Sequence, residues 1–201
     1  IDKLRDTMQS HERCSLVEVM GRDAGDIALQ TAIAVGASAV AIREVEFDEE
    51  AMMEDLKASR ESGKRNFIII VSEGLPGYGE KLTSMIPEKT GIETRFARLA
   101  HVVRGGSPSL RDRMLGSTMG AAAVEMLLRG KSNIVVCEQK GEITTMDIGE
   151  ALIIDRMYKD KLKEGDLQKY DAKTVEYMRC FCKKKFDALK KLYDLAYEIS
   201  R

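Results

Sequence analysis

Residues 67–71 read Phe-Ile-Ile-Ile-Val, and a loop signal, Gly74-Leu75-Pro76-Gly77, follows this apolar run closely. A continuous apolar run of this length is typical of a strand that is buried on both faces of a parallel sheet, whereas a half-exposed strand alternates polar and apolar residues. The sequence therefore predicts a buried strand at 67–71.

The segments on either side of this run alternate between strand and helix patterns. We expect strands at 14–20, 39–42, 94–99 and 133–137, helices at 27–35, 48–62, 79–86, 108–128, 146–158 and 173–200, and a polar linker at 159–172. The helix at 79–86 is expected to end before Pro87, because the residue before a proline avoids the helical conformation. Such alternation predicts an α/β protein, a three-layer α/β/α Rossmann-like sandwich with a mostly parallel sheet.

The composition argues against several classes of partner. The 201 residues carry 32 Lys and Arg against 33 Asp and Glu, so the net charge of −1 produces no field that attracts nucleic acid or a membrane surface. There is no Trp, and no apolar run reaches the roughly 20 residues that span a bilayer. A chain of 201 residues is long enough for one domain or one and a half. We expect neither a nucleic-acid partner nor a membrane partner.

The cysteines favour a cytoplasmic protein. Cys14 and Cys137 lie in strand-like apolar runs, where a reduced, buried thiol is usual. Cys180 and Cys182 have no second pair and no nearby histidine, so we expect no metal site. Residues 1–6 resemble neither a secretory signal nor a natural start, and we expect a fragment of a longer protein.

Three of the expected strands end in residues that can bind a ligand. These ends carry Met20-Gly21-Arg22, Ser72-Glu73-Gly74 and the stretch from His101 to Arg104. Right-handed crossovers bring the carboxyl ends of parallel strands to one edge of the sheet, and ligands of open α/β sheets bind there. We therefore expect a ligand at this edge.

The segment 99–108 has the composition of a phosphate-binding turn. His101 and Arg104 lie three residues apart, Gly-Gly-Ser-Pro follows them, and Arg95 lies six residues before His101. Cationic donors and small residues suit a phosphomonoester, which is close to dianionic at neutral pH. The alternative is a basic turn before a helix.

Two further features have a functional and a structural interpretation. The turn 21–26 contains two glycines and precedes a helix, so its free N–H groups favour an anion, although it could equally be a plain turn. Glu73 could accept hydrogen bonds from sugar hydroxyls, or it could cap a helix or join an ion pair.

Together these residues resemble the C-terminal half of a bacterial-type 6-phosphofructokinase. The resemblance extends over residues 1–153 and depends on the combined spacing of short motifs. These motifs are Ile1-Asp2-Lys3-Leu4-Arg5-Asp6-Thr7, Val17-Glu18-Val19-Met20-Gly21-Arg22, Gly25-Asp26, Glu73 after its apolar strand, Glu93-Thr94-Arg95, and His101-x-x-Arg104-Gly105-Gly106-Ser107-Pro108.

The resemblance implies substrate-binding roles for the matched residues. His101 and Arg104 would hold the 6-phosphate of fructose 6-phosphate. Met20 and Gly21 would line the sugar, and Glu73 would accept hydrogen bonds from the sugar hydroxyls.

Other roles follow from the same resemblance. Arg22 would lie near the transferred phosphoryl group, and no catalytic residue is expected in the fragment itself. Arg13 and Arg95 would reach the phosphate from a neighbouring subunit of a homotetramer, so the substrate site would be shared between subunits. The sequence departs from the family at Ala100, where Gly is usual, and at Val103, where Gln is usual.

An allosteric effector site is also implied. Arg5 and Lys64 match its pattern around Gly36, whereas Ser38 and Ser62 stand where an acidic and a basic residue are often found. These two serines put effector control in question.

The family's nucleotide-binding and catalytic motifs, Gly-Gly-Asp-Gly and Thr-Ile-Asp-Asn-Asp, do not occur in the 201 residues. We therefore expect ATP and Mg²⁺ to serve only the full-length parent, and we expect the fragment to bind neither and to be inactive alone. The resemblance places the fructose 6-phosphate-binding domain at 1–102 plus 154–201. Residues 103–153 would return to the absent nucleotide-binding domain, so part of their packing surface would be bare.

The main functional hypothesis is a 6-phosphofructokinase, which transfers a phosphoryl group from ATP to the 1-hydroxyl of fructose 6-phosphate in glycolysis. One alternative is a pyrophosphate-dependent relative. Another is a non-catalytic module that binds a sugar phosphate or a nucleotide.

Overall fold

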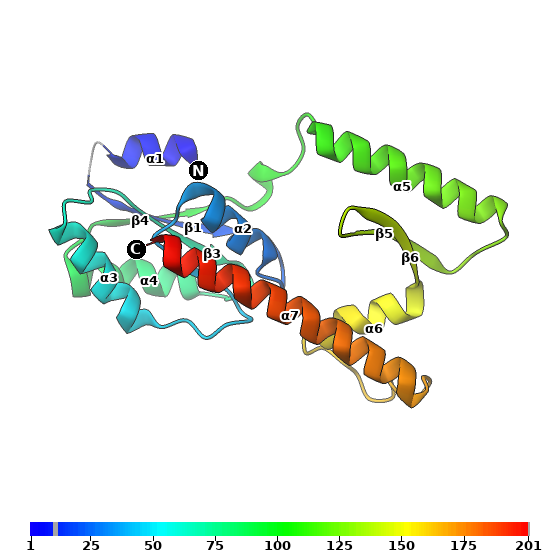
Figure 1. Ribbon diagram of the computed structural model, residues 1–201. Coiled ribbons are helices and arrows are strands. Elements are labelled where there is room, and N and C mark those ends of the chain that lie inside the picture. The colour runs from blue at the N-terminus through cyan, green and yellow to red at the C-terminus, as the bar shows by residue number, and fades with distance from the viewer. Residues whose placement is uncertain (10–11, 201) are drawn as a thin grey trace. The chain divides into compact units, whose positions relative to one another are not determined.

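The computed structural model describes residues 1–9 and 12–200, and the chain divides into two compact units (Figure 1). The first unit consists of residues 1–103 and 186–201, and the second consists of residues 104–185. The first unit contains two clusters of buried apolar side chains, and the second unit contains one.

The sheet of the first unit has four parallel strands in the order β2-β3-β1-β4. They are β1 (Cys14–Val19), β2 (Ala39–Ala41), β3 (Phe67–Ser72) and β4 (Thr94–Arg98). The apolar run predicted as a buried strand is β3, which pairs with β1 on one side and β2 on the other. Cys14 lies opposite both Phe67 and Thr94, so the carboxyl ends of β1, β3 and β4 meet at one edge.

Alternate side chains of these strands enter two separate cores, because successive residues of a strand point to opposite faces. Leu16 and Ile69 belong to one core, and Val17 and Ile70 belong to the other. The first core is covered by α3 (Glu49–Glu61) and α4 (Tyr78–Thr90); the second is covered by α1 (Asp2–Gln9), α2 (Asp26–Val35) and the C-terminal part of α7 (Ala172–Ser200). This arrangement confirms the predicted three-layer α/β/α fold.

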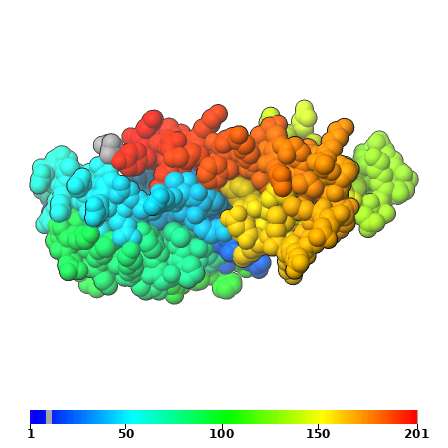
Figure 2. Space-filling model, turned by 90° about the horizontal axis from the view of Figure 1, so that it is seen from below, coloured from blue at the N-terminus to red at the C-terminus, as the bar shows by residue number. Residues whose placement is uncertain are grey.

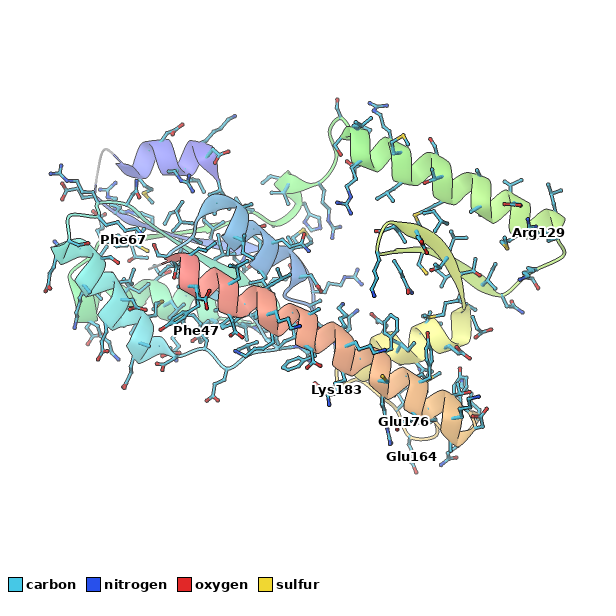
Figure 3. All side chains as sticks on the ribbon, in the orientation of Figure 1. Phe47, Phe67, Arg129, Glu164, Glu176 and Lys183 are labelled. Carbon is cyan, nitrogen blue, oxygen red and sulfur yellow. The ribbon has the colours of Figure 1, made fainter. Side chains whose placement is uncertain are left out.

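The C-terminal turns of α7 lie beside α3 within the first unit (Figure 2). Leu189 and Ala196 of α7 are buried in the second core. A cavity of about 310 Å³ lies beside them, and its lining includes Met52 of α3, Phe47 (labelled in Figure 3) and Tyr193. The C-terminal part of the predicted amphipathic helix at 173–200 therefore completes the helical layer on one face of the sheet.

The second unit contains helices and a hairpin. Its elements are α5 (Leu110–Leu128), β5 (Ile134–Gln139), β6 (Glu142–Asp147), α6 (Ile148–Tyr158) and the N-terminal part of α7. Ile153, Ile154 and Met178 form its buried core. These apolar side chains hold α6 against α7.

The strand predicted at 133–137 corresponds to β5, whereas its antiparallel partner β6 was not predicted. Lys140 and Gly141 both have positive φ, 56° and 87°, which allows a two-residue turn between the strands. The helix predicted to start at Met146 starts two residues later, because Met146 and Asp147 are the last residues of β6. Asp147 caps α6 by accepting a hydrogen bond from the Glu150 N–H.

Two further helix boundaries differ from the prediction. α4 continues through Pro87 to Thr90, because Ile86 is fully buried in the core and the remaining carbonyls find donors, such as the Gly91 N–H on the Pro87 oxygen. α5 begins at Leu110 rather than at Pro108, since Ser109 forms a capping box with Asp112.

The second unit extends further along the chain than the predicted return segment 103–153. Residues 154–185 belong to it rather than to the first unit, because Ile154 packs with Met178. Along α5, all of which the structure describes, no residue is buried; Leu110, Leu127 and Leu128 are 79%, 68% and 84% exposed. Among the helices of the described residues, none is both long enough and apolar enough to cross a membrane.

Candidate functional site

The turn after β1 is held by the carboxylate that follows β3. The Gly21 N–H and the Arg22 N–H both donate to Glu73 Oε1, at 3.0 Å and 2.6 Å. Glu73 itself continues the parallel ladder by donating its N–H to the Val19 carbonyl at 3.0 Å. Two of the three predicted strand ends are therefore brought together by direct hydrogen bonds.

The backbone approaches closely at two glycines, one in this turn and one in the loop after β3. A Cβ on Gly21 would lie 2.4 Å from the Ala24 carbonyl oxygen, and a Cβ on Gly74 would lie 2.7 Å from the Arg22 carbonyl oxygen. Both positions therefore exclude a side chain. Met20 is half-buried, whereas Arg22 is exposed and has a left-handed backbone with φ of 52°.

The far end of the same turn is fixed as well. The Gly25 N–H donates to Glu44 Oε1 at 2.8 Å, and a Cβ on Gly25 would lie 2.6 Å from the Ile42 Cβ. Glu44 was not among the predicted site residues. Its carboxylate closes the turn at the start of α2, as Glu73 closes it at the end of β1.

His101 lies at the same sheet edge, in the short 3-10 helix η1 (Ala100–Val103) directly after β4. The Leu99 N–H donates to the Glu18 carbonyl at 3.2 Å and continues the pairing of β4 with β1. The His101 side chain is exposed. Arg104 is exposed too and is the first residue of the second unit.

Arg13 and Arg95 lie at the opposite edge of the sheet, where β1 and β4 begin. Both contact Glu93: Arg13 Nε lies 2.7 Å from Oε2, and Arg95 Nη2 lies 2.5 Å from Oε1. The hydrogen bond from Arg13 is the main reason that the pKa of Glu93 is lowered. Within one chain these two arginines are together, but they do not join Arg22 and Glu73.

Ala100 has a left-handed backbone with φ of 44°, at the position where the resembled family usually has Gly. A Cβ in this conformation crowds the following carbonyl, which glycine avoids. We expect Ala100→Gly to stabilise the protein by about 0.5–1 kcal/mol in urea denaturation, net of the entropy that glycine adds to the unfolded chain. Ala34→Gly, on the exposed side of α2, is the matched control and should destabilise by a similar amount; a loss of stability in both variants would contradict the backbone argument.

Of the implied effector residues, the structure brings two together. Arg5 donates to the Val35 carbonyl at the end of α2, next to Gly36, whose φ of 58° ends the helix. Lys64 lies over the Phe67 ring, 5.8 Å from its centroid, and burial lowers the pKa of this lysine.

The two serines that depart from the effector pattern lie together in the first unit. Ser38 and Ser62 line a cavity of about 370 Å³ with Ser59 and Asp55. Among the residues that the structure describes, neither a lysine nor an arginine lines it. The Asp55 carboxylate would repel a phosphate, so this cavity does not suit an anionic effector.

In the described part of the chain, no group of three or more His, Cys, Asp or Glu residues is placed to hold a metal ion.

Comparison with known proteins gives a consistent family. The sequence profile of the family described as Phosphofructokinase matches residues 1–127. The chain is 48% identical over 164 residues to ATP-dependent 6-phosphofructokinase 1 of Clostridium perfringens, covering 82% of this chain and 51% of that protein. It is 45% identical over 175 residues to ATP-dependent 6-phosphofructokinase of Clostridium botulinum, covering 87% and 52%. The chain thus spans about half the length of the curated relatives it matches.

Solved structures agree. Phosphofructokinase from Saccharomyces cerevisiae superposes with a TM-score of 0.74 at 27% identity, over 92% of this chain and 26% of that one. A pyrophosphate-dependent phosphofructokinase from Nitrosospira multiformis superposes with a TM-score of 0.63 at 20% identity, over 74% and 43%, which is a likeness of fold alone.

Proposed function

We propose that this chain, which belongs to the phosphofructokinase family, carries the fructose 6-phosphate side of an ATP-dependent 6-phosphofructokinase and corresponds to its C-terminal half. The observation that carries the proposal is the pair of hydrogen bonds from the Gly21 and Arg22 amides to Glu73, at the edge where His101 also lies. ATP is the donor that the names of the 45–48% identical relatives support.

The side chains at this edge have complementary roles in binding. His101 donates to the 6-phosphate, and we assign Arg104 to the same phosphate on the family motif that it shares with His101. Glu73 holds the turn at Gly21 in place, so Arg22 is presented to the reacting end of the sugar. Phosphoryl transfer depends on positioning and on charge stabilisation. His101, Arg104 and Arg22 would therefore contribute to the reaction by orienting the 1-hydroxyl of the bound sugar.

A second copy of the chain is part of the proposal. Arg13 and Arg95 lie at the opposite edge from Arg22, held side by side by Glu93. We assign them to the phosphate bound by a neighbouring subunit, in a homo-oligomer with shared sites.

A protein of this kind works in the reducing cytoplasm, and the four cysteines are free thiols.

The chain is expected to bind the sugar phosphate without catalysing the reaction. In calorimetric titration, the 201-residue chain is expected to bind fructose 6-phosphate saturably and to bind fructose, which lacks the phosphate, far more weakly. It is expected to form no fructose bisphosphate from ATP, because the family's Gly-Gly-Asp-Gly and Thr-Ile-Asp-Asn-Asp motifs do not occur in the 201 residues. Equal binding of fructose and fructose 6-phosphate would contradict the proposal.

A further inference from the structure

One arginine links three elements at the edge of the proposed site. Arg98, the last residue of β4, donates from Nε to Glu18 Oε1 at 2.5 Å and from Nη2 to Glu18 Oε2 at 3.3 Å. Its Nη2 also lies 2.7 Å from Glu80 Oε1, in the first turn of α4. Arg98 therefore joins β1, β4 and α4 through a single side chain.

Two of the three linked elements, β1 and β4, lead directly into proposed substrate-binding residues. Glu18 lies two residues before Met20, and Arg98 lies three residues before His101. The backbone follows the same connection, since the Leu99 N–H donates to the Glu18 carbonyl at 3.2 Å and the Val102 N–H donates to the Leu99 carbonyl at 3.2 Å. A shift of the Arg98 end of β4 would thus move η1.

The residues beside Arg98 are closely packed. Gly79 of α4 is buried, and a Cβ there would lie 2.5 Å from Phe96 Cε2. The Arg98 guanidinium lies 5.4 Å from the centroid of the same ring. α4 and β4 are therefore in van der Waals contact through Phe96, with Arg98 hydrogen-bonded across this contact.

The Glu18 partner makes the link costly to break. The Glu18 side chain is 9% exposed, whereas those of Arg98 and Glu80 are 51% and 52% exposed. Removing the guanidinium would leave the Glu18 carboxylate poorly solvated and without this partner, a far larger penalty than the loss of an exposed ion pair. The chain would relieve that penalty by moving the ends of β1 and β4 apart.

We propose that Arg98 is a positioning residue for fructose 6-phosphate: its bonds to Glu18 and Glu80 hold the η1 turn, and with it His101, against the turn at Met20. This inference rests on the proposed function. Arg98 acts through η1 and is not assigned a contact with the sugar.

The test compares Arg98→Met, Arg98→Lys and a control, Arg65→Met, in the 201-residue chain. Arg65 forms an exposed ion pair with Glu12 at the other edge of the sheet, 3.4 Å apart. Two quantities are measured: the dissociation constant for fructose 6-phosphate and the hydrogen-exchange rates of the backbone amides. Both are measured at a temperature well below the unfolding transition of each variant.

We expect Arg98→Met to weaken binding about tenfold or more, because a binding group must be held within about 0.5 Å of its productive position. Exchange should accelerate at the Leu99 and Val102 amides and not throughout the sheet. Arg98→Lys should fall between wild type and Arg98→Met, since one ammonium cannot reproduce the fork that reaches both carboxylates. Arg65→Met should change neither readout.

Wild-type affinity in Arg98→Met, or an exchange increase spread evenly over the sheet, would overturn the proposal. If the wild-type chain does not bind fructose 6-phosphate at all, the proposed function fails. The positioning claim then stands or falls on the exchange of Leu99 and Val102 alone, which separates the two failures.

Discussion

Replacing both His101 and Arg104 by alanine is expected to weaken the binding of fructose 6-phosphate by about 10²- to 10⁴-fold. A hydrogen bond to a charged group contributes about 1.5–3 kcal/mol, and a tenfold change in affinity corresponds to about 1.4 kcal/mol. The phosphate would lose two such bonds. Calorimetric titration of the double variant against wild type measures the loss directly.

The control for this double variant removes charge elsewhere. Lys183 (labelled in Figure 3) and Lys184 are exposed residues of α7 with no proposed role in binding. Lys183→Ala with Lys184→Ala should leave the affinity within a factor of about two at physiological salt, where exposed charges are screened beyond about 8 Å. A loss as large as that of the His101 and Arg104 variant would mean that the charge of the chain, and not a phosphate site, governs binding.

The largest loss of stability is expected for Ile69→Ala, at about 2–5 kcal/mol. Ile69 lies in the middle of β3, has no exposed surface and pairs with Leu16 on one side and Ala39 on the other. Truncation removes apolar contacts and leaves a cavity that the close-packed sheet cannot fill. Urea denaturation, with the slope checked for two-state behaviour, measures the loss.

Ile27→Ala is the matched control for this variant. Ile27 is the same residue type, but it lies on α2 and is 53% exposed. Its truncation should change the free energy of unfolding by about 0.5 kcal/mol or less. Similar losses for the two variants would show that β3 is not the centre of the core.

The local character of the apolar runs explains why most of the first unit could be predicted. Residues 67–71 have one environment, burial on both faces, and the helices between the strands have ordinary ends, such as Asp48 capping α3 on the Ala51 N–H. Prediction failed where tertiary contacts decide. α4 passes through Pro87 because Ile86 is buried, and β6 forms because it has β5 to pair with.

The candidate site divides in a similar way. The meeting of Gly21 with Glu73 follows from parallel strands that end at one edge, and such an edge can be anticipated from the strand pattern. The pairing of Arg98 with Glu18 and Glu80 could not be anticipated, because it depends on the register of β1 with β4 and on the start of α4. Glu44 was missed for the same reason, since it is 19 residues from Gly25.

The proposed function requires that separate strand ends surround one phosphorylated sugar. The most direct test follows the backbone amide resonances of the chain during titration with fructose 6-phosphate. We expect the Gly21, Arg22 and His101 amides to shift together along one binding curve. Shifts at only one of these strand ends, or three curves with different midpoints, would contradict a single site.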